Sequence, residues 1–190
     1  MLTLNNLLIN QGDIILAPGD YFHPEFSRED YHLLPPLLQG KHNQYLIKRY
    51  QLPLPKGQTL LLPKLLLQHW KQLPTIAVHL GALLQMGPQP WSEKFANRKT
   101  LEQYFNQPLN SHEILGCNKP ETLIVLGAAQ VLSYLAPFGY LYTERAKYMF
   151  SQDIQKLITT HTKAMLPWNI IEETCHYVSR NRDNKTRIRG

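Results

Sequence analysis

Residues 120–135 read PETLIVLGAAQVLSYL and are apolar on almost every side of a helix. A helix with so few polar positions is either buried in the middle of a globular protein or embedded in a membrane. Asn118 has a side chain suited to capping a helix, and Pro120 has the fixed backbone angle that suits an early helical position. We therefore expect a helix that begins near Pro120 and occupies the centre of the fold.

A membrane span is the alternative for this stretch. The uncharged run Thr122–Thr143 is long enough to cross a bilayer. However, Gln130 and Ser133 lie in its middle, and Pro137 and Gly139 interrupt a helix near its end. No strong positive cluster, of the kind that marks the cytoplasmic end of a membrane helix, flanks it. These features favour a buried central helix.

Proline residues occur throughout the rest of the chain and are expected to divide it into short helices. Asp13–Ala17 suggests only a short strand or turn, and residues 52–57 suggest an extended linker. We expect helices from Ser27 to Pro35-Pro36, over 41–51, over 60–86 with a break at Leu73-Pro74, over 93–106, over 144–160 and over 169–178. The predicted fold class is mainly α, a single compact helical domain with an irregular N-terminal segment. A chain of 190 residues with 43% hydrophobic residues is large enough for such a core.

The net charge of +6 is concentrated at the C-terminal end. Residues 180–190 carry one acidic side chain, Asp183, and five basic ones that are the candidate partner-binding residues: Arg180, Arg182, Lys185, Arg187 and Arg189. We expect a helical domain over 1–179 and a flexible basic tail over 180–190. Such a tail can solubilise the chain, bind phosphates or dock onto an acidic protein surface. Without interleaved aromatic residues or a known nucleic-acid motif, nucleic-acid binding is the weaker alternative.

The sequence shows no catalytic, cofactor or metal motif. No two of its eight histidines have the four-residue spacing of a helical metal site, and His112-Glu113 is followed by Gly116 where a second histidine would be needed. Cys175-His176 is an adjacent pair whose side chains point about 100° apart on a helix. We therefore expect no catalytic residue, no cofactor and no metal. The two cysteines lack CxxC spacing and the first residues lack an export signal, which favours the cytoplasm.

Three segments resemble the SctK family of type III secretion adaptors, whose members include OrgA, MxiK and PscK. Asp20-Tyr21-Phe22-His23-Pro24 is similar to the family's N-terminal aromatic-aliphatic-His-Pro segment. The most specific match is a Trp-x-x-Leu-Pro-x-x-Ala-x-x-Leu-Gly element formed by Trp70, Leu73, Pro74, Ala77, Leu80 and Gly81. The third segment, Cys117-Asn118-Lys119-Pro120, resembles the start of the family's central helix. These matching residues, His23, Asn118 and Lys119 among them, have the character of fold-defining positions.

The resemblance implies a mostly helical cytoplasmic adaptor with no catalytic role. It would join an inner-membrane ring scaffold protein, through an SctD-like cytoplasmic domain, to an SctQ-like pod protein of the sorting platform. Stator and ATPase would be indirect partners, and the chain would be peripheral to the membrane, with neither a membrane span nor bound nucleic acid. A small basic helical nucleic-acid-binding protein is the alternative function, and an enzyme with an unrecognised site is a further one.

Overall fold

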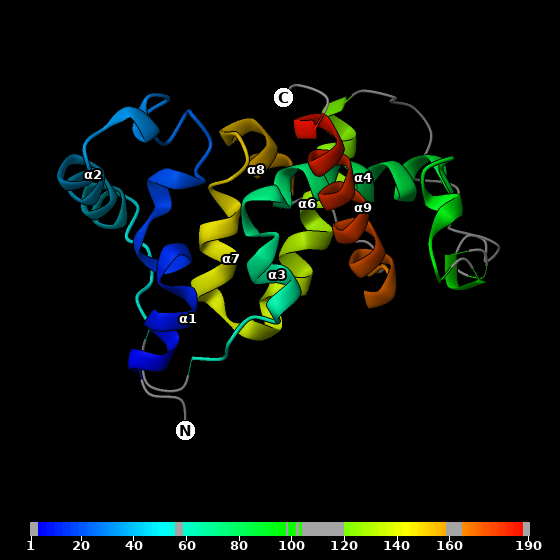
Figure 1. Cartoon of the computed structure of the whole chain (residues 1–190), viewed down its shortest axis with the longest axis horizontal. Helices are drawn as coiled ribbons and strands as arrows, with labels where there is room; N and C mark the ends of the chain where they lie inside the picture. The colour runs from blue at the N-terminus through cyan, green and yellow to red at the C-terminus, as the bar shows by residue number, and fades with distance from the viewer. Residues whose placement is uncertain are drawn as a thin grey trace. The chain divides into compact units, whose positions relative to one another are not determined.

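A computed structural model describes residues 4–55, 59–97, 99–101, 103, 120–158 and 165–187. Helices account for most of these residues, and no strand occurs among them, which confirms the mainly α prediction. Figure 1 shows the helices in chain order, from blue α1 to orange-red α9. The chain divides into two compact units. Unit 1 comprises Met1–Lys71 and Leu132–Lys156, and unit 2 comprises Gln72–Val131 and Leu157–Gly190.

Unit 1 is built around short helices joined by extended or turning segments. Its elements are α1 (Leu4–Leu16), η1 (Pro18–Asp20), η2 (Tyr31–Leu33), α2 (Pro36–Arg49), α3 (Lys64–Gln68), η6 (Ala136–Phe138) and α7 (Tyr140–Lys147). η3 (Trp70–Gln72) begins in this unit, as does α8 (Gln152–Ile158). Phe22, Leu46 and Leu52 form one buried cluster, although the polypeptide between them turns repeatedly. Of the linker predicted over residues 52–57, the described residues 52–55 form neither helix nor strand.

The N-terminal segment is helical, so the prediction of a strand or turn at Asp13–Ala17 is wrong. Leu7, Ile14 and Ile15 are buried at a spacing of two helical turns, which gives α1 one apolar side. Gln11 has a non-helical backbone at φ −137°, and this kink shifts the helical spacing of the apolar residues before it relative to those after it. The kink separates two short helical pieces, each too brief to show a clear period by itself.

The prediction of a helix from Ser27 to Pro35-Pro36 is also wrong. Only the short turn η2 forms there, and α2 begins at Pro36, where the predicted helix was expected to end. Pro35 is extended, with ψ 148°, while Pro36 occupies a first-turn position at which its missing N–H needs no partner. The helix predicted over 41–51 corresponds to the later part of α2, which ends at Arg49.

Unit 2 contains the central helix expected from the sequence. α6 (Pro120–Leu135) begins at the predicted proline, and its residues through Val131 belong to this unit. The expected break at Leu73-Pro74 is also observed, because α4 (Leu73–Met86) begins there after η3. α4 packs against α9 (Trp168–Arg187), and Ile76, Ile170 and Cys175 are among the fully buried residues of this unit.

Two glycines bring the backbones of α4 and α6 into direct contact. A Cβ atom added to Gly81 would overlap the carbonyl oxygen of Leu123, and one added to Gly127 would overlap the carbonyl oxygen of Ala77. Each helix therefore presents a glycine to a carbonyl group of the other. No residue with a side chain fits at either position unless the helices move apart.

Four other predicted helices have different bounds in the structure. The helix expected to begin at residue 60 begins at Lys64, and its first part is the short α3 followed by η3. The helix expected over 93–106 is replaced at its start by η4 (Ser92–Lys94), and residues 104–106 lie outside the described part. The helix expected over 144–160 is divided into α7 and α8 by the turn at residues 148–151. The helix expected to end near Val178 continues to Arg187, so the backbone of residues 180–187 is helical.

One helical stretch of the described chain, Pro120–Phe138, has the length and hydropathy of a membrane span. In the structure 44% of that apolar window is buried. Within unit 2, the contacts of Gly81 and Gly127 place α4 against this helix. The same composition occurs in core helices of soluble proteins, because both environments exclude charged side chains.

Candidate functional site

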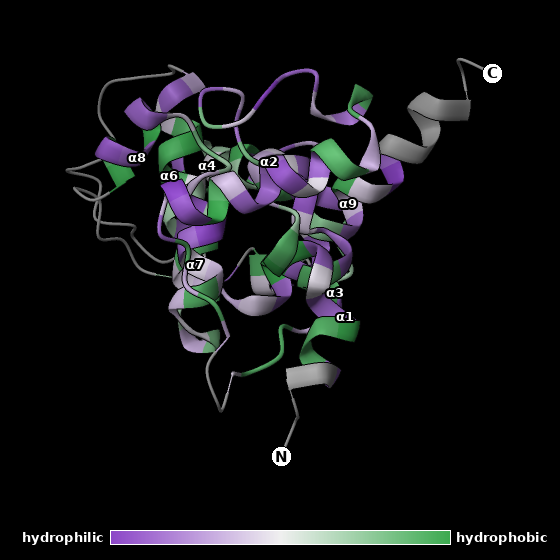
Figure 2. Cartoon of the chain, turned by 90° about the vertical axis from the view of Figure 1, so that its left-hand side faces the viewer, coloured by the Kyte–Doolittle hydropathy of each residue, from purple (hydrophilic) through white to green (hydrophobic). Residues whose placement is uncertain are grey.

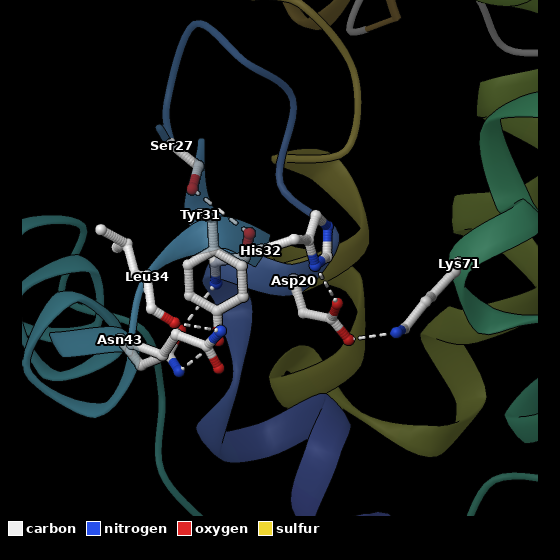
Figure 3. A network of polar contacts seen from close by, with 9 residues as sticks. Asp20, Ser27, Tyr31, His32, Leu34, Asn43 and Lys71 are labelled. Atoms are coloured by element: carbon white, nitrogen blue, oxygen red, sulfur yellow. Dashed lines mark hydrogen bonds and ion pairs between the residues drawn. The ribbon is translucent and has the colours of Figure 1, made fainter. Parts of the chain in front are cut away.

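A network of polar contacts fixes α2 to the N-terminal segment of unit 1, and Figure 3 shows it. Asn43 is at the centre of this network and is only 7% exposed. Its Oδ1 atom accepts a hydrogen bond from the backbone N–H of Gly19 at 2.8 Å, and its Nδ2 atom donates to the Tyr31 hydroxyl at 2.8 Å. The Asn43 side chain therefore ties α2 to both η1 and η2.

Further contacts surround Asn43 (Figure 3). Ser27 Oγ lies 3.1 Å from His42 Nε2 and donates to the carbonyl oxygen of Gly19 at 3.3 Å. Burial lowers the pKa of His42 below its ordinary value, which favours the neutral imidazole. Asp20 forms an ion pair with Lys71 and lies 3.5 Å from His32 Nδ1. The Ser27–His42 contact therefore adds to those that hold the inner side of α2, and Asp20 joins η1 to η2 and η3.

Aromatic rings fill the space beside this network. Tyr148 lies at the centre of the group, with ring centroids 5.1 Å from Phe22, 5.2 Å from Phe26 and 4.7 Å from Tyr50. The backbone N–H of His23 donates to the carbonyl oxygen of Tyr148 at 2.9 Å. Because Tyr50 directly follows α2, the cluster fixes the C-terminal end of this helix as the polar network fixes its middle.

The opposite side of α2 faces solvent. Leu37 is 71% exposed and Tyr45 is 51% exposed, and the exposed cations Lys41 and Arg49 lie on the same face. The Arg49 guanidinium donates to the Tyr45 hydroxyl at 2.8 Å and lies 5.7 to 5.8 Å from the ring centroids of Tyr45 and Tyr50. We call this surface, formed by Leu37, Leu38, Lys41, Tyr45, Lys48 and Arg49, the α2 face.

A buried arginine connects three separate segments of unit 1. The Arg145 side chain is fully buried, and it donates to the carbonyl oxygens of Pro53 at 2.6 Å, Ile15 at 3.0 Å and Leu141 at 3.2 Å. No carboxylate of the described residues lies within ion-pair distance of it, so its charge is solvated by peptide dipoles. Burial lowers the pKa of Arg145. The residue remains a cation, because an arginine pKa starts far above neutrality.

Tyr142 extends this internal network. Its hydroxyl lies 2.6 Å from Gln11 Oε1 and 2.8 Å from the carbonyl oxygen of Leu60. Burial raises the pKa of Tyr142 to about 12, so the phenol stays protonated and can donate at neutral pH. α7 thus supplies two polar side chains that hold α1 and the backbone at Pro53 and Leu60 in place.

The described residues contain no group of three or more His, Cys, Asp or Glu side chains placed to hold a metal ion. The Cys175-His176 pair is divided between environments: Cys175 is fully buried and His176 is exposed. Burial raises the pKa of the Cys175 thiol to about 12. Cys175 is therefore a protonated core residue at neutral pH and is unsuited to act as a nucleophile. His112 and Glu113 lie outside the described residues.

A family model described as bacterial type III secretion apparatus protein (OrgA_MxiK) matches residues 12–180. The chain belongs to this OrgA/MxiK family. The match extends beyond the three resembling segments in both directions, and it includes all of α2 and α7. No curated protein and no solved structure matched the chain.

Most of the OrgA/MxiK motif residues that the structure describes are buried. Trp70 is 3% exposed, and its ring centroid lies 5.8 Å from that of Tyr21 and 6.5 Å from that of Tyr142. On α4, Pro74 is partly exposed, and the other four motif residues are buried: Leu73, Ala77, Leu80 and Gly81. His23 is partly exposed, Pro24 and Pro120 are exposed, and Asn118 and Lys119 lie outside the described residues.

The candidate residues of the basic tail are described only in part. Arg180 is exposed on α9, and the backbone of Arg182, Lys185 and Arg187 continues the same helix. Arg189 lies outside the described residues. Sequence reasoning missed both the α2 face and Arg145. Arg145 could have been found from its spacing, because it lies on the α7 side that carries Leu141, Tyr142 and Ala146.

Proposed function

We propose that the chain is a non-enzymatic adaptor of a bacterial type III secretion apparatus. The observation that carries this proposal is the family match over residues 12–180. In the proposed role, one surface binds the cytoplasmic domain of the inner-membrane ring scaffold and another binds the pod protein of the sorting platform. The stator and ATPase would be reached through the pod. The protein would then act at the cytoplasmic face of the inner membrane without crossing it.

Two features of the structure support a binding role. The α2 face combines exposed leucine and tyrosine side chains with cations that take part in none of the ion pairs found among the described residues, and such a mixture suits a protein interface. The motif residues on α4 are mostly buried, which suits a role in folding, so contact residues are expected elsewhere on the surface. An adaptor needs several interfaces of this kind and no reactive group.

Co-purification tests the proposal. The tagged full-length chain is expressed in the bacterium that encodes it, in cells that produce the secretion apparatus, and captured near physiological salt after nuclease treatment. We expect mass spectrometry to identify the ring scaffold and the pod protein in amounts comparable with the chain. Recovery of neither protein from cells with an intact apparatus would contradict the proposal.

A matched variant distinguishes the adaptor function from the alternative that the chain binds nucleic acid. Replacing Arg180, Arg182, Lys185, Arg187 and Arg189 with glutamine removes the basic charge near the C-terminal end without shortening α9. If the chain works by binding nucleic acid, the variant should lose that affinity and its steep salt dependence. If it is an adaptor whose contacts lie elsewhere, the variant should still recover the ring and pod proteins.

A further inference from the structure

The α2 face lies in a long part of the sequence that has no acidic residue. No Asp or Glu occurs between Asp30 and Glu93, while six basic residues do: Lys41, Lys48, Arg49, Lys56, Lys64 and Lys71. Three of them belong to α2, and all three are exposed. None of the ion pairs found among the described residues involves these three cations. The positive charge of α2 is therefore not neutralised within unit 1.

Apolar side chains share the same surface. Leu37 is 71% exposed and Leu38 is 45% exposed, and Leu33, just before the helix, is 85% exposed. The exposed leucines and the exposed tyrosine of α2 supply apolar surface that a binding partner would cover. The inner side of α2 is already occupied, because Asn43 and Leu46 are buried. The exposed leucines are thus available to another molecule.

The order of these side chains along α2 indicates what kind of molecule fits. Leu37, Lys41, Tyr45 and Arg49 follow one another at intervals of four residues, which places them in a single row along the helix. Apolar and cationic groups therefore alternate in the row. The hydroxyl of Tyr45 and the rings of Tyr45 and Tyr50 hold the Arg49 side chain in place. The side chain therefore loses less conformational entropy when its guanidinium binds a carboxylate.

We propose that the α2 face docks a segment of another protein in which acidic side chains alternate with apolar ones. The carboxylates would pair with Lys41 and Arg49, and the apolar side chains would cover Leu37 and Tyr45. The inference rests on the proposed function only in requiring a protein partner, and it adds the surface and the chemistry of the segment that binds there.

The observations favour such a segment over other occupants. A helix that lies on a lipid bilayer separates its apolar side from its charged side, whereas the row on α2 mixes the two. Figure 2 shows hydrophilic colours along much of α2. A nucleic acid would leave the exposed leucines uncovered, and a second copy of the same face would bring like charges together.

The test combines charge reversal with site-specific crosslinking in the full-length chain. The variant Lys41→Glu/Arg49→Glu reverses two charges of the row, and the control Lys64→Glu/Lys94→Glu reverses two exposed charges on other elements. Binding to the purified ring-scaffold domain, to the pod protein and to phosphatidylglycerol vesicles is measured at low and high salt. Thermal melting verifies that each variant is folded.

We expect the α2 variant to bind one of the two proteins at least about tenfold more weakly than the wild-type chain at low salt, with a smaller difference at high salt. The control should bind like the wild-type chain. A photo-crosslinker at position 37, introduced in cells with the intact apparatus, should attach to a partner segment that alternates acidic and apolar residues. Lysine substitutions of those acids should restore binding to the α2 variant.

Other results would overturn the inference. Unchanged protein binding by the α2 variant, a crosslinked segment without carboxylates, or loss of vesicle binding alone would each exclude an acidic protein segment. If the wild-type chain binds neither the ring nor the pod protein, the proposed function fails, and the crosslink in cells then decides the α2 inference separately. A crosslink to an acidic segment of a different protein would support the α2 inference, provided that lysine substitutions in that segment restore binding to the α2 variant. The absence of any crosslink would refute the inference.

Discussion

Gly81 of α4 lies directly against the carbonyl oxygen of Leu123 on α6, at a distance that leaves no room for a side chain. The reciprocal contact is between Gly127 and the carbonyl oxygen of Ala77. Two helices can approach this closely only where both lack a Cβ atom at the crossing point. The separation of α4 and α6 therefore depends on these two glycines.

Gly81→Ala should lower the free energy of unfolding by about 3 kcal/mol, because the new methyl group forces two backbones apart. Gly40→Ala is the matched control, since Gly40 is also inside a helix but nothing lies within 4 Å of an added Cβ atom. There the same change should raise stability by about 0.5 to 1 kcal/mol. Urea unfolding of both variants tests the difference, and equal effects would show that the crossing is looser than described.

Arg145→Met should lower the free energy of unfolding by about 2 to 4 kcal/mol. The substitution keeps most of the side-chain volume but removes the donors to the buried carbonyl oxygen of Ile15 and to the partly buried carbonyl oxygen of Pro53. Arg28→Met serves as the control, because the Arg28–Asp30 pair is exposed to solvent and should contribute little to stability. Chemical unfolding measures both, and a neutral Arg145→Met variant would mean that water reaches those carbonyl groups.

His79 should make the fold less stable in mild acid. It lies 4.8 Å from the ring of Trp91 and 5.3 Å from that of Tyr177, and burial lowers its pKa below the ordinary value of 6.5. Between these two pKa values the unfolded chain binds more protons than the folded one, so stability falls as pH decreases through that range. In His79→Gln, this part of the pH dependence should disappear.

The melting temperatures of the wild-type chain and the His79→Gln variant, compared between about pH 7.5 and 5, test this prediction. Burial also lowers the pKa of His42, which acts in the same direction, so the double variant with His42→Gln should have a still flatter profile. Identical slopes in all three proteins would contradict the assignment.

Cys175 should resist thiol reagents while the protein is folded. Its side chain is fully buried and burial raises its pKa to about 12, so both access and the thiolate population are low. In a Cys117→Ser background, Ellman's reagent near neutral pH should react with no thiol of the native chain and with one thiol after denaturation. Rapid native labelling would place Cys175 in an opening part of unit 2.

The helices that could be predicted from sequence are those whose signals are uninterrupted. α6 has a proline at its start and an apolar sequence to its end, and α4 begins at the predicted Leu73-Pro74 junction. α1 could not be predicted because the non-helical backbone of Gln11 breaks its period. The start of α2 could not be predicted, because a proline can either end a helix or begin one. The roles of Pro35 and Pro36 depend on their backbone conformation, which the sequence does not give.

The candidate surface was less predictable than the fold. Leucines are expected in a core, yet Leu37 and Leu38 are exposed because Asn43 and Leu46 turn the other side of α2 inward. That choice depends on hydrogen bonds from Gly19 and to Tyr31, which are distant in sequence. Local periodicity cannot supply such long-range contacts.

Both units are assembled from two separate stretches of chain, and this affects how the protein can be made. During translation the first stretch of unit 1 emerges before Arg145 has been synthesised. The carbonyl groups of Ile15 and Pro53 therefore lack their arginine donor until α7 has been made. Unit 2 is incomplete until α9 has been synthesised, and α9 follows the second stretch of unit 1 in the chain. A nascent chain stopped anywhere between Gln72 and Val131 would contain neither unit in full, and its apolar segments would be exposed to chaperones and proteases.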